Sequence, residues 1–290
     1  MRITALTFIL LTSAAAALEP YATFRASMID ESSGLVKSRQ YPGVYWTHND
    51  SGDKARLFGI RHDGSLIQPN WYLGKYPGVL VHNAVNIDWE DITTDGAGNL
   101  AIGAFGNNDS DRTDLSIYIL PEPNPADEHT IRATRQIRFS YPDQLVFPPE
   151  KKNYDAEALF YAYGKYHILS KHWSDTDTTL YRFDSMKDDQ LNVLSLVQTF
   201  PIGGMVTAAD FDPERQLLAV LTYSSIWLFE TTEDSLLGGK NYRYVLKNQK
   251  QCEAICFDGD NILFTNEEGE LFTIPITTVI EESEKKAAAQ

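Results

Sequence analysis

The chain repeats one plan of short strands five times, and this repetition constrains its fold more than any other feature. Each copy has a short strand that begins with a polar residue, a tight turn, a strand that ends in polar residues, and a third strand. An aromatic residue lies near the middle of each third strand: Phe58, Tyr118, Tyr181, Trp227 and Phe272. Strand signals separated by turn residues about every 8 to 12 positions are typical of all-β sandwiches, barrels and propellers.

An extended fourth segment follows most copies, at residues 65–74, 129–141, 191–200 and 240–248. The fifth copy lacks such a segment, but residues 20–28 form a strand signal that belongs to no copy. A propeller uses a leftover strand of this kind to complete its last blade, which removes free sheet edges. We therefore predict an all-β fold over residues 18–278: a five-bladed β-propeller of four-stranded blades, closed by the N-terminal strand. The alternative is a large β-sandwich whose strands resemble one another by accident.

The two ends of the chain differ from the repeats. Residues 1–17 have one arginine, an apolar run and then small residues, which is the layout of a secretory signal peptide. The apolar run is shorter than the about 20 residues that a membrane span needs. We expect cleavage after Ala15 or Ala17 and a secreted or periplasmic protein without membrane insertion; an uncleaved anchor is the alternative. The charged, alanine-rich residues 279–290 are expected to be disordered.

The charge balance narrows the choice of partners. With 40 acidic and 25 basic residues, the chain has a formal net charge of −15. This charge disfavours nucleic acids and anionic membrane surfaces, and it suits the binding of cations. The two cysteines, Cys252 and Cys256, would lie about 13 Å apart in an extended strand, whereas a disulfide needs α-carbons within about 7 Å. We expect two packed thiols.

A recurring polar position in the first strands points to a metal. The residues at this position of the five copies form a column in the aligned repeats. Because first strands line the channel of a propeller, the residues of this column would face each other across the channel. Like carboxylates at such range cannot all stay ionised without a counter-charge, and the column contains no lysine or arginine. Calcium suits several carboxylates and hydroxyls and tolerates irregular geometry better than magnesium does. The alternative is that the glutamates are protonated or bind backbone amides. In chain order the column is Ser33, Glu90, Glu157, Ala209 and Glu253.

This column resembles the axial calcium site of the five-bladed propellers of the calcium-dependent apyrase (nucleotidase) family, whose inner strands supply a similar mixture of serine and glutamate. The resemblance covers the blade plan and the four predicted calcium ligands, and Ala209 departs from it. It implies calcium binding and, more weakly, nucleotidase activity. The stretches "DAEAL" and "CEAIC" resemble, more loosely, strand openings of phytase-like and esterase-like propellers of exported bacterial proteins. The four predicted ligands are Ser33, Glu90, Glu157 and Glu253.

The ends of second strands and the loops into first strands open on one face of such a ring. We expect a small-molecule or protein ligand to bind there, to a protein that is a monomer. For catalysis, Glu90 or Asp91 is the candidate base, and His82 or His172 would assist because histidine titrates near neutrality. The residues expected around the metal include Asp50, Asp88, Asp155, Trp173, Tyr223 and Glu267.

Three functions fit these patterns. The first is a calcium-dependent hydrolase of phosphoesters, phosphoanhydrides or esters. The second is a glycosidase that pairs Glu157 with Glu253 or with Glu90, as two carboxyl groups are required for sugar hydrolysis. The third is a binding module in which the ion only makes the ring rigid. The sequence has no nucleophile elbow, phosphate-binding loop or zinc-protease motif.

Overall fold

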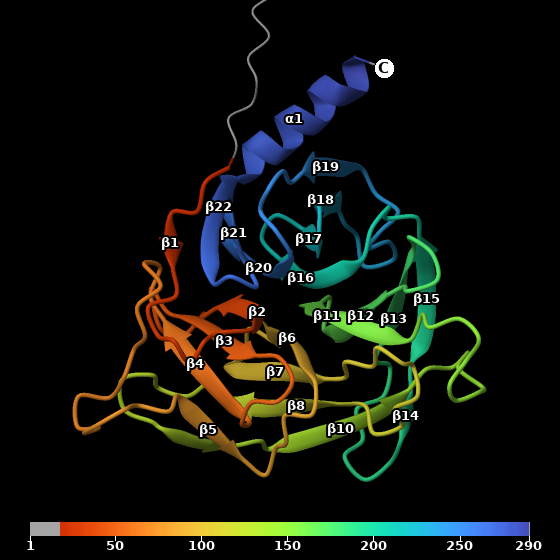
Figure 1. Cartoon of the computed structure of the whole chain (residues 1–290). Coiled ribbons are helices and arrows are strands. Elements are labelled where there is room, and N and C mark those ends of the chain that lie inside the picture. Colours follow the sequence, from red (N-terminus) through yellow and green to blue (C-terminus); the bar gives the residue numbers. More distant parts are fainter. Residues whose placement is uncertain (1–17, 290) are drawn as a thin grey trace, which may run out of the picture.

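The computed structural model describes residues 18–289. In this part of the chain, five sheets surround a common axis like the blades of a propeller (Figure 1), which confirms the predicted fold. Blade 1 comprises β2 (Ser32–Lys37), β3 (Tyr45–Asn49), β4 (Arg56–Ile60), β5 (Val79–His82) and β9 (Thr130–Arg132). Blade 2 comprises β6 (Trp89–Thr94), β7 (Asn99–Ala104), β8 (Ser116–Pro121), β10 (Arg135–Ser140) and β14 (Asn192–Val193). Blade 3 comprises β11 (Asp155–Ala162), β12 (Lys165–Lys171), β13 (Thr178–Arg182) and β15 (Ser195–Phe200). Blade 4 comprises β16 (Val206–Asp212), β17 (Leu217–Thr222), β18 (Ser225–Glu230) and β19 (Asn241–Val245). Blade 5 comprises β20 (Cys252–Asp258), β21 (Asn261–Asn266), β22 (Glu270–Pro275) and β1 (Ala22–Thr23).

The N-terminal strand closes the ring as predicted. Strand β1 pairs antiparallel with β22, with Ala22 opposite Leu271 and Thr23 opposite Glu270. The five aromatic residues of the repeat all lie in the third strands β4, β8, β13, β18 and β22. Hydrophobic clusters fill the spaces between adjacent sheets, so that each blade packs on both of its faces.

The fourth strands differ in part from the prediction. In blade 1 the segment 65–74 is a loop, and β5 is the fourth strand; Pro69 offers no backbone N–H and Gly74 has a φ of 102°, so the segment suits a loop better than a strand. Two other predicted segments each divide into two strands. Strands β9 and β14 first pair in parallel with the preceding blade, at β5 and β10, and the chain then continues into β10 and β15.

A bulge interrupts every first strand near its start. In β11, Ala156 pairs with Ser170 and Ala158 with Leu169, so Glu157 is an extra residue without a partner. Ala156 packs between blades 2 and 3, whereas Ala158 packs between blades 3 and 4. The extra residue thus reverses the alternation of the strand and leaves its own side chain outside both cores. The bulges in the other first strands lie at Ser33, Glu90–Asp91, Thr207 and Glu253.

The bulge in blade 4 corrects the predicted column. The extra residue of β16 is Thr207, and Ala209 lies two positions further along, paired with Val220 and packed in a hydrophobic cluster. Matching apolar positions across the copies misses a bulge, because the extra residue shifts the alternation. The Thr207 hydroxyl donates a hydrogen bond to the carbonyl of Cys252 at 2.8 Å and so links blades 4 and 5.

Residues 279–288, which we expected to be disordered, are helical, whereas Gln290 lies outside the described residues. Helix α1 (Ile276–Ala288) lies on the outside of the ring against β19 and β22 (Figure 1). Val279 and Ile276 are buried, and Ile280 packs against the same cluster. These residues lie three and four positions apart, which places them on one face of a helix.

Both cysteines are free and buried, as expected. The bulge at Glu253 places Cys252 in the cluster between blades 4 and 5 and Cys256 in the cluster between blades 5 and 1. The predicted signal peptide falls on residues 1–17, outside the described residues. Across residues 18–289, the one helix is too short to qualify as a membrane span.

Candidate functional site

A pocket of about 560 Å³ opens on the axis where the first strands begin. The structure brings the four predicted calcium ligands together on its wall. Eight acidic residues and a single basic residue, Lys171, line this axial pocket. Its wall also includes Ser32, Asn108, Trp173, Tyr223 and Gln251. The acidic residues are Asp30, Glu31, Asp50, Glu90, Glu157, Glu253, Glu267 and Glu268.

Three carboxylates meet on the side of blades 1 and 2. Asp50 follows β3, Asp88 precedes β6, and Glu90 is in the bulge of β6; one oxygen from each lies within 4.8 Å of the others. Ser33 Oγ donates a hydrogen bond to Glu90 Oε2 at 3.3 Å. Burial and the neighbouring Asp88 raise the pKa of Asp50 to about 6. Burial and Glu157 raise the pKa of Glu90 well above its usual range.

Gly106 makes room for these carboxylates. A Cβ atom on Gly106 would lie 2.0 Å from Glu90 Oε1 and 2.4 Å from Asp88 Oδ2. Its backbone N–H donates to the carbonyl of Asp88, and its carbonyl accepts a hydrogen bond from Arg112. A residue with a side chain at this position would displace the carboxylates, so glycine is required by their positions.

On the opposite side, Lys171 reaches the axis. It is the last residue of β12, and its Nζ donates to Glu157 Oε1 at 2.9 Å, with 7% and 4% of the two side chains exposed. The sequence pattern missed this charge, because Lys171 belongs to a second strand and lies outside the column. Burial tends to lower the pKa of Lys171, but the attraction of Glu157 and Tyr223 outweighs burial and raises it. Burial and Asp155 raise the pKa of Glu157, and Lys171 opposes this rise.

The blade 5 side of the pocket carries the carboxyl group of Glu253, whose pKa is raised. Burial raises the pKa of Glu253 to about 7, although a hydrogen bond from Gln251 and the charge of Lys171 oppose the rise. Gln251 Nε2 donates to Glu253 Oε1 at 2.7 Å and also contacts Glu267 and the hydroxyl of Tyr223. A side chain of this kind can donate or accept a proton at physiological pH.

An aromatic side chain forms part of the rim. Trp173 is 43% exposed, and its Nε1 donates to Asp155 Oδ2 at 2.8 Å. Asp155 is fully buried and also accepts a hydrogen bond from the backbone N–H of Asn107 at 2.6 Å. The position of the indole is therefore fixed by blades 2 and 3 while part of it remains open to a ligand.

Of the four predicted catalytic residues, only Glu90 lines the axial pocket. Asp91 is fully buried, and its carboxylate accepts hydrogen bonds from the backbone N–H groups of Ile92, Leu159 and Ala209. This residue ties three blades together, which does not suit a base. His82 is exposed at the end of β5, where it pairs with Arg132 of β9 on the outer edge of blade 1.

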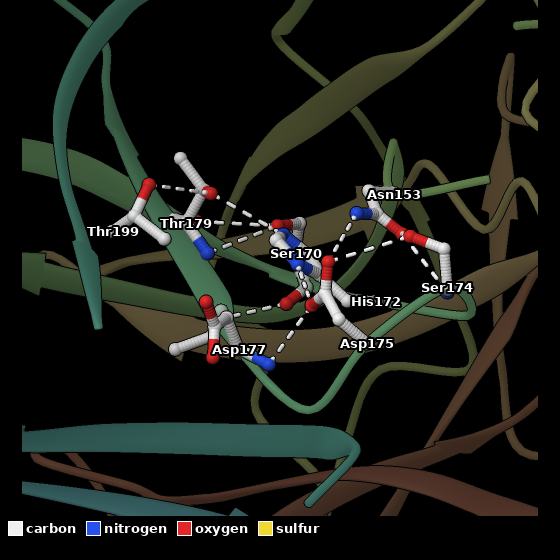
Figure 2. A network of polar contacts seen from close by, with 9 residues as sticks. Asn153, Ser170, His172, Ser174, Asp175, Asp177, Thr179 and Thr199 are labelled. Carbon is white, nitrogen blue, oxygen red and sulfur yellow. Dashed lines mark hydrogen bonds and ion pairs between the residues drawn. The ribbon is translucent and has the colours of Figure 1, made fainter. Parts of the chain in front are cut away.

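His172 belongs to a network of polar contacts (Figure 2) and is followed in the sequence by Trp173 of the pocket wall. Its Nδ1 lies 2.7 Å from Asp175 Oδ1 and its Nε2 lies 3.2 Å from Thr179 Oγ1, so both ring nitrogens have partners. Asp175 also binds Ser174 and Asn153 in the same network. The network orders the loop after β12, and the loop carries Trp173. His172 is in this arrangement a positioning residue.

The comparisons with known proteins give the fold and no family. No family model matches the chain, and no curated protein matches it. Among solved structures, the PQQ-bound aldose sugar dehydrogenase from Streptomyces coelicolor is 9% identical, with a TM-score of 0.50 over 89% of this chain and 97% of that one. An exo-β-1,3-galactanase from Clostridium thermocellum is 12% identical, with a TM-score of 0.52; this chain spans 89% of its own length but 61% of the galactanase chain. At these identities the likeness extends to the propeller fold, and the resemblance to the apyrase family stays a prediction.

Proposed function

We propose that this propeller binds a calcium ion in its axial pocket, and that the pocket binds and hydrolyses a small molecule with a phosphoester, phosphoanhydride or ester group. The observation that carries the proposal is the composition of the pocket wall, with eight acidic residues and one lysine. Such a wall concentrates cations, and calcium prefers carboxylate and hydroxyl oxygens. The sequence predicts a signal peptide at residues 1–17, and we expect an exported protein to meet more calcium than a cytosolic one.

The residues that would hold the ion are Asp50, Asp88 and Glu90, with Ser33 beside them. Calcium binds oxygens at about 2.3 to 2.6 Å, so two ligands of one ion can lie almost 5 Å apart. The separation of at most 4.8 Å among the three carboxylates fits this range. Gly106 supports the same placement, because the lack of a side chain there lets the carboxylates of Glu90 and Asp88 come together. This set leaves out two of the four ligands that the sequence predicts: Glu157, which already binds Lys171, and Glu253, which accepts a hydrogen bond from Gln251.

The side chains of the pocket suit hydrolysis as well as binding. When bound, the ion would supply Lewis-acid activation of the substrate oxygen or of a water molecule. Lys171 would bind an anionic group of the substrate, which the acidic wall would otherwise repel. Glu253, with a pKa near 7, can transfer a proton, and the exposed part of Trp173 can stack against the rest of the molecule.

The first test is the metal content of the protein purified without chelator, followed by calcium titration calorimetry. We expect one calcium ion per chain, and loss of most of the affinity in Asp50→Asn and Asp88→Asn. Asp109→Asn is the matched control, because Asp109 is exposed and binds Lys152. Phosphatase, nucleotidase and esterase panels with and without EDTA then test the reaction. Turnover that survives EDTA, or a wild type that binds no calcium, would contradict the proposal.

A glycosidase is the second candidate. It is favoured by two carboxyl groups in different environments, since burial raises the pKa of Glu253 to about 7 whereas Glu157 faces an ammonium group. Sugar hydrolysis uses such a pair, one group as acid and the other as base or nucleophile. Sugar release that is insensitive to EDTA would favour this function. An EDTA-induced fall in melting temperature without turnover on any panel would favour a binding module instead.

A further inference from the structure

Lys171 and Glu157 form the most buried ion pair among the described residues. Both belong to blade 3, Glu157 at the bulge of β11 and Lys171 at the end of β12. The pair lies on the wall of the axial pocket with Glu90 and Glu253, the other glutamates of the column. An ammonium group is therefore present at the position for which the sequence pattern predicts a metal.

Two aromatic rings hold the ammonium group in place. Lys171 Nζ lies 5.0 Å from the centre of the Trp173 ring and 5.3 Å from the centre of the Tyr223 ring. Aromatic faces attract cations, and the attraction is larger where water is excluded. Since Trp173 is fixed by its hydrogen bond to Asp155 and Tyr223 is within hydrogen-bond range of Gln251, the position of Nζ is determined by three blades.

A metal ion and this ammonium group would compete for the same carboxylate. A calcium ion bound by Glu157 would have to lie about 2.3 to 2.6 Å from its oxygens. Lys171 Nζ is 2.9 Å from Oε1, so an ion on this carboxylate would lie close to another positive charge in a buried place. Two cations on one buried carboxylate repel each other strongly.

We propose that Lys171 is a built-in axial cation that takes, at Glu157, the place of the metal ion that the column of glutamates would otherwise bind. The ammonium group neutralises Glu157, whereas a metal ion is confined to the carboxylates of blades 1 and 2. The wall of the axial pocket thus contains its own positive charge opposite the carboxylate of Glu157. This inference concerns the axis alone and holds whether or not an ion binds at Asp50 and Asp88.

The experiment compares calcium binding by wild type, Lys171→Met, Glu157→Gln and the double variant Lys171→Met/Glu157→Gln. The measurements are the number of bound ions by titration calorimetry on metal-free protein and the melting temperature in EDTA and in calcium. Lys152→Met is the matched control, because Lys152 binds the exposed Asp109 on the same face. We expect Lys171→Met to melt several degrees lower in EDTA, to recover in calcium, and to bind one ion more than wild type. The double variant and the control should not gain the ion.

Two results would overturn the inference. One is an equal number of bound ions in Lys171→Met and wild type; the other is a wild-type calcium ion that is lost in Glu157→Gln. If Lys171→Met does not fold even in calcium while the double variant does, the metal part of the inference is also wrong. Failure of the proposed function is a separate result, namely no calcium bound by wild type, and the difference between variant and wild type still decides the role of Lys171.

Discussion

Asp210 in β16 accepts a hydrogen bond from the backbone N–H of Phe257 in β20 at 2.8 Å, and this bond ties the first strands of blades 4 and 5. Asp91 does the same for blades 2, 3 and 4 through Leu159 and Ala209. Carboxylates therefore have two roles along the axis. Those of Asp50, Asp88 and Glu90 are available to a ligand, and those that bind backbone amides hold the ring together.

Replacement of Asp91 by alanine should destabilise the protein without changing its metal affinity. The variant leaves the backbone N–H groups of Ile92, Leu159 and Ala209 without an acceptor. Unsatisfied buried donors cost about 1 to 3 kcal/mol each, so we expect the free energy of unfolding to fall by about 3 to 5 kcal/mol. Denaturant unfolding measures this change, and the exposed Asp188→Ala is the control. A stable Asp91→Ala protein without activity would instead support the original role of Asp91 as base.

Gly106→Ala should weaken calcium binding by tenfold or more, because the new methyl group would displace the carboxylates of Glu90 and Asp88. A displacement that costs ~1.4 kcal/mol or more corresponds to this factor. Calcium titration calorimetry is the measurement. Gly204→Ala is the control, since its nearest contact is Thr222 Oγ1 at 3.3 Å. Unchanged affinity in Gly106→Ala would place the ion elsewhere in the pocket.

The pH dependence of the free energy of unfolding should reveal the raised pKa of Glu253. Its pKa rises from the usual 4.5 to about 7 in the folded protein. The protonated form therefore stabilises the fold below pH ~4.5, and this contribution is lost as the pH rises through ~7. Glu253→Gln stays neutral, so in EDTA its stability relative to wild type should increase from pH 5 to pH 8, by at most about 3 kcal/mol. A difference that is constant over this range would mean that Glu253 is ionised throughout.

Helix α1 should contribute measurably to stability. Val279 is fully buried against the outer surface of blades 4 and 5. Val279→Asp buries an unpaired charge or releases the helix, and we expect a loss of about 2 to 4 kcal/mol in the free energy of unfolding. Thermal melting measures the loss, and Glu281→Ala, on the same helix at an exposed position, is the control. Equal melting temperatures for both variants would indicate that α1 does not stabilise the propeller.

The repeat was sufficient to predict the five blades, the closing strand and the four residues of the column that line the axial pocket. Ser33, Glu90, Glu157 and Glu253 could be found because bulged residues face the axis and keep a polar character in each copy. Thr207 could not be found, because the apolar residues that follow it allow two alignments of this copy with the others. The strand pairing of β16 with β17 decides between these alignments. The sequence also gives no sign of β9 and β14, since a segment of two or three residues carries too little pattern to distinguish two blades.

Lys171 shows a different limit of sequence reasoning. The residue was absent from the column because the column contained first strands alone, whereas its side chain extends from a second strand to the axis. A long side chain can carry its charge into a neighbouring layer of residues. Burial and pairing of such a charge depend on the three-dimensional arrangement of Glu157, Trp173 and Tyr223, which lie on three different strands or loops.

The bulges have a consequence for how such a protein can change. An extra residue that packs in neither core can be replaced without creating a cavity or a clash between blades. Exchange of the hydroxyl for a carboxylate at Ser33, for example, would alter the electrostatic field in the axial pocket while the cores retain their shape. New chemistry can therefore arise by single substitutions at those bulged residues that hold no other residue in place, which excludes Thr207 and Glu157.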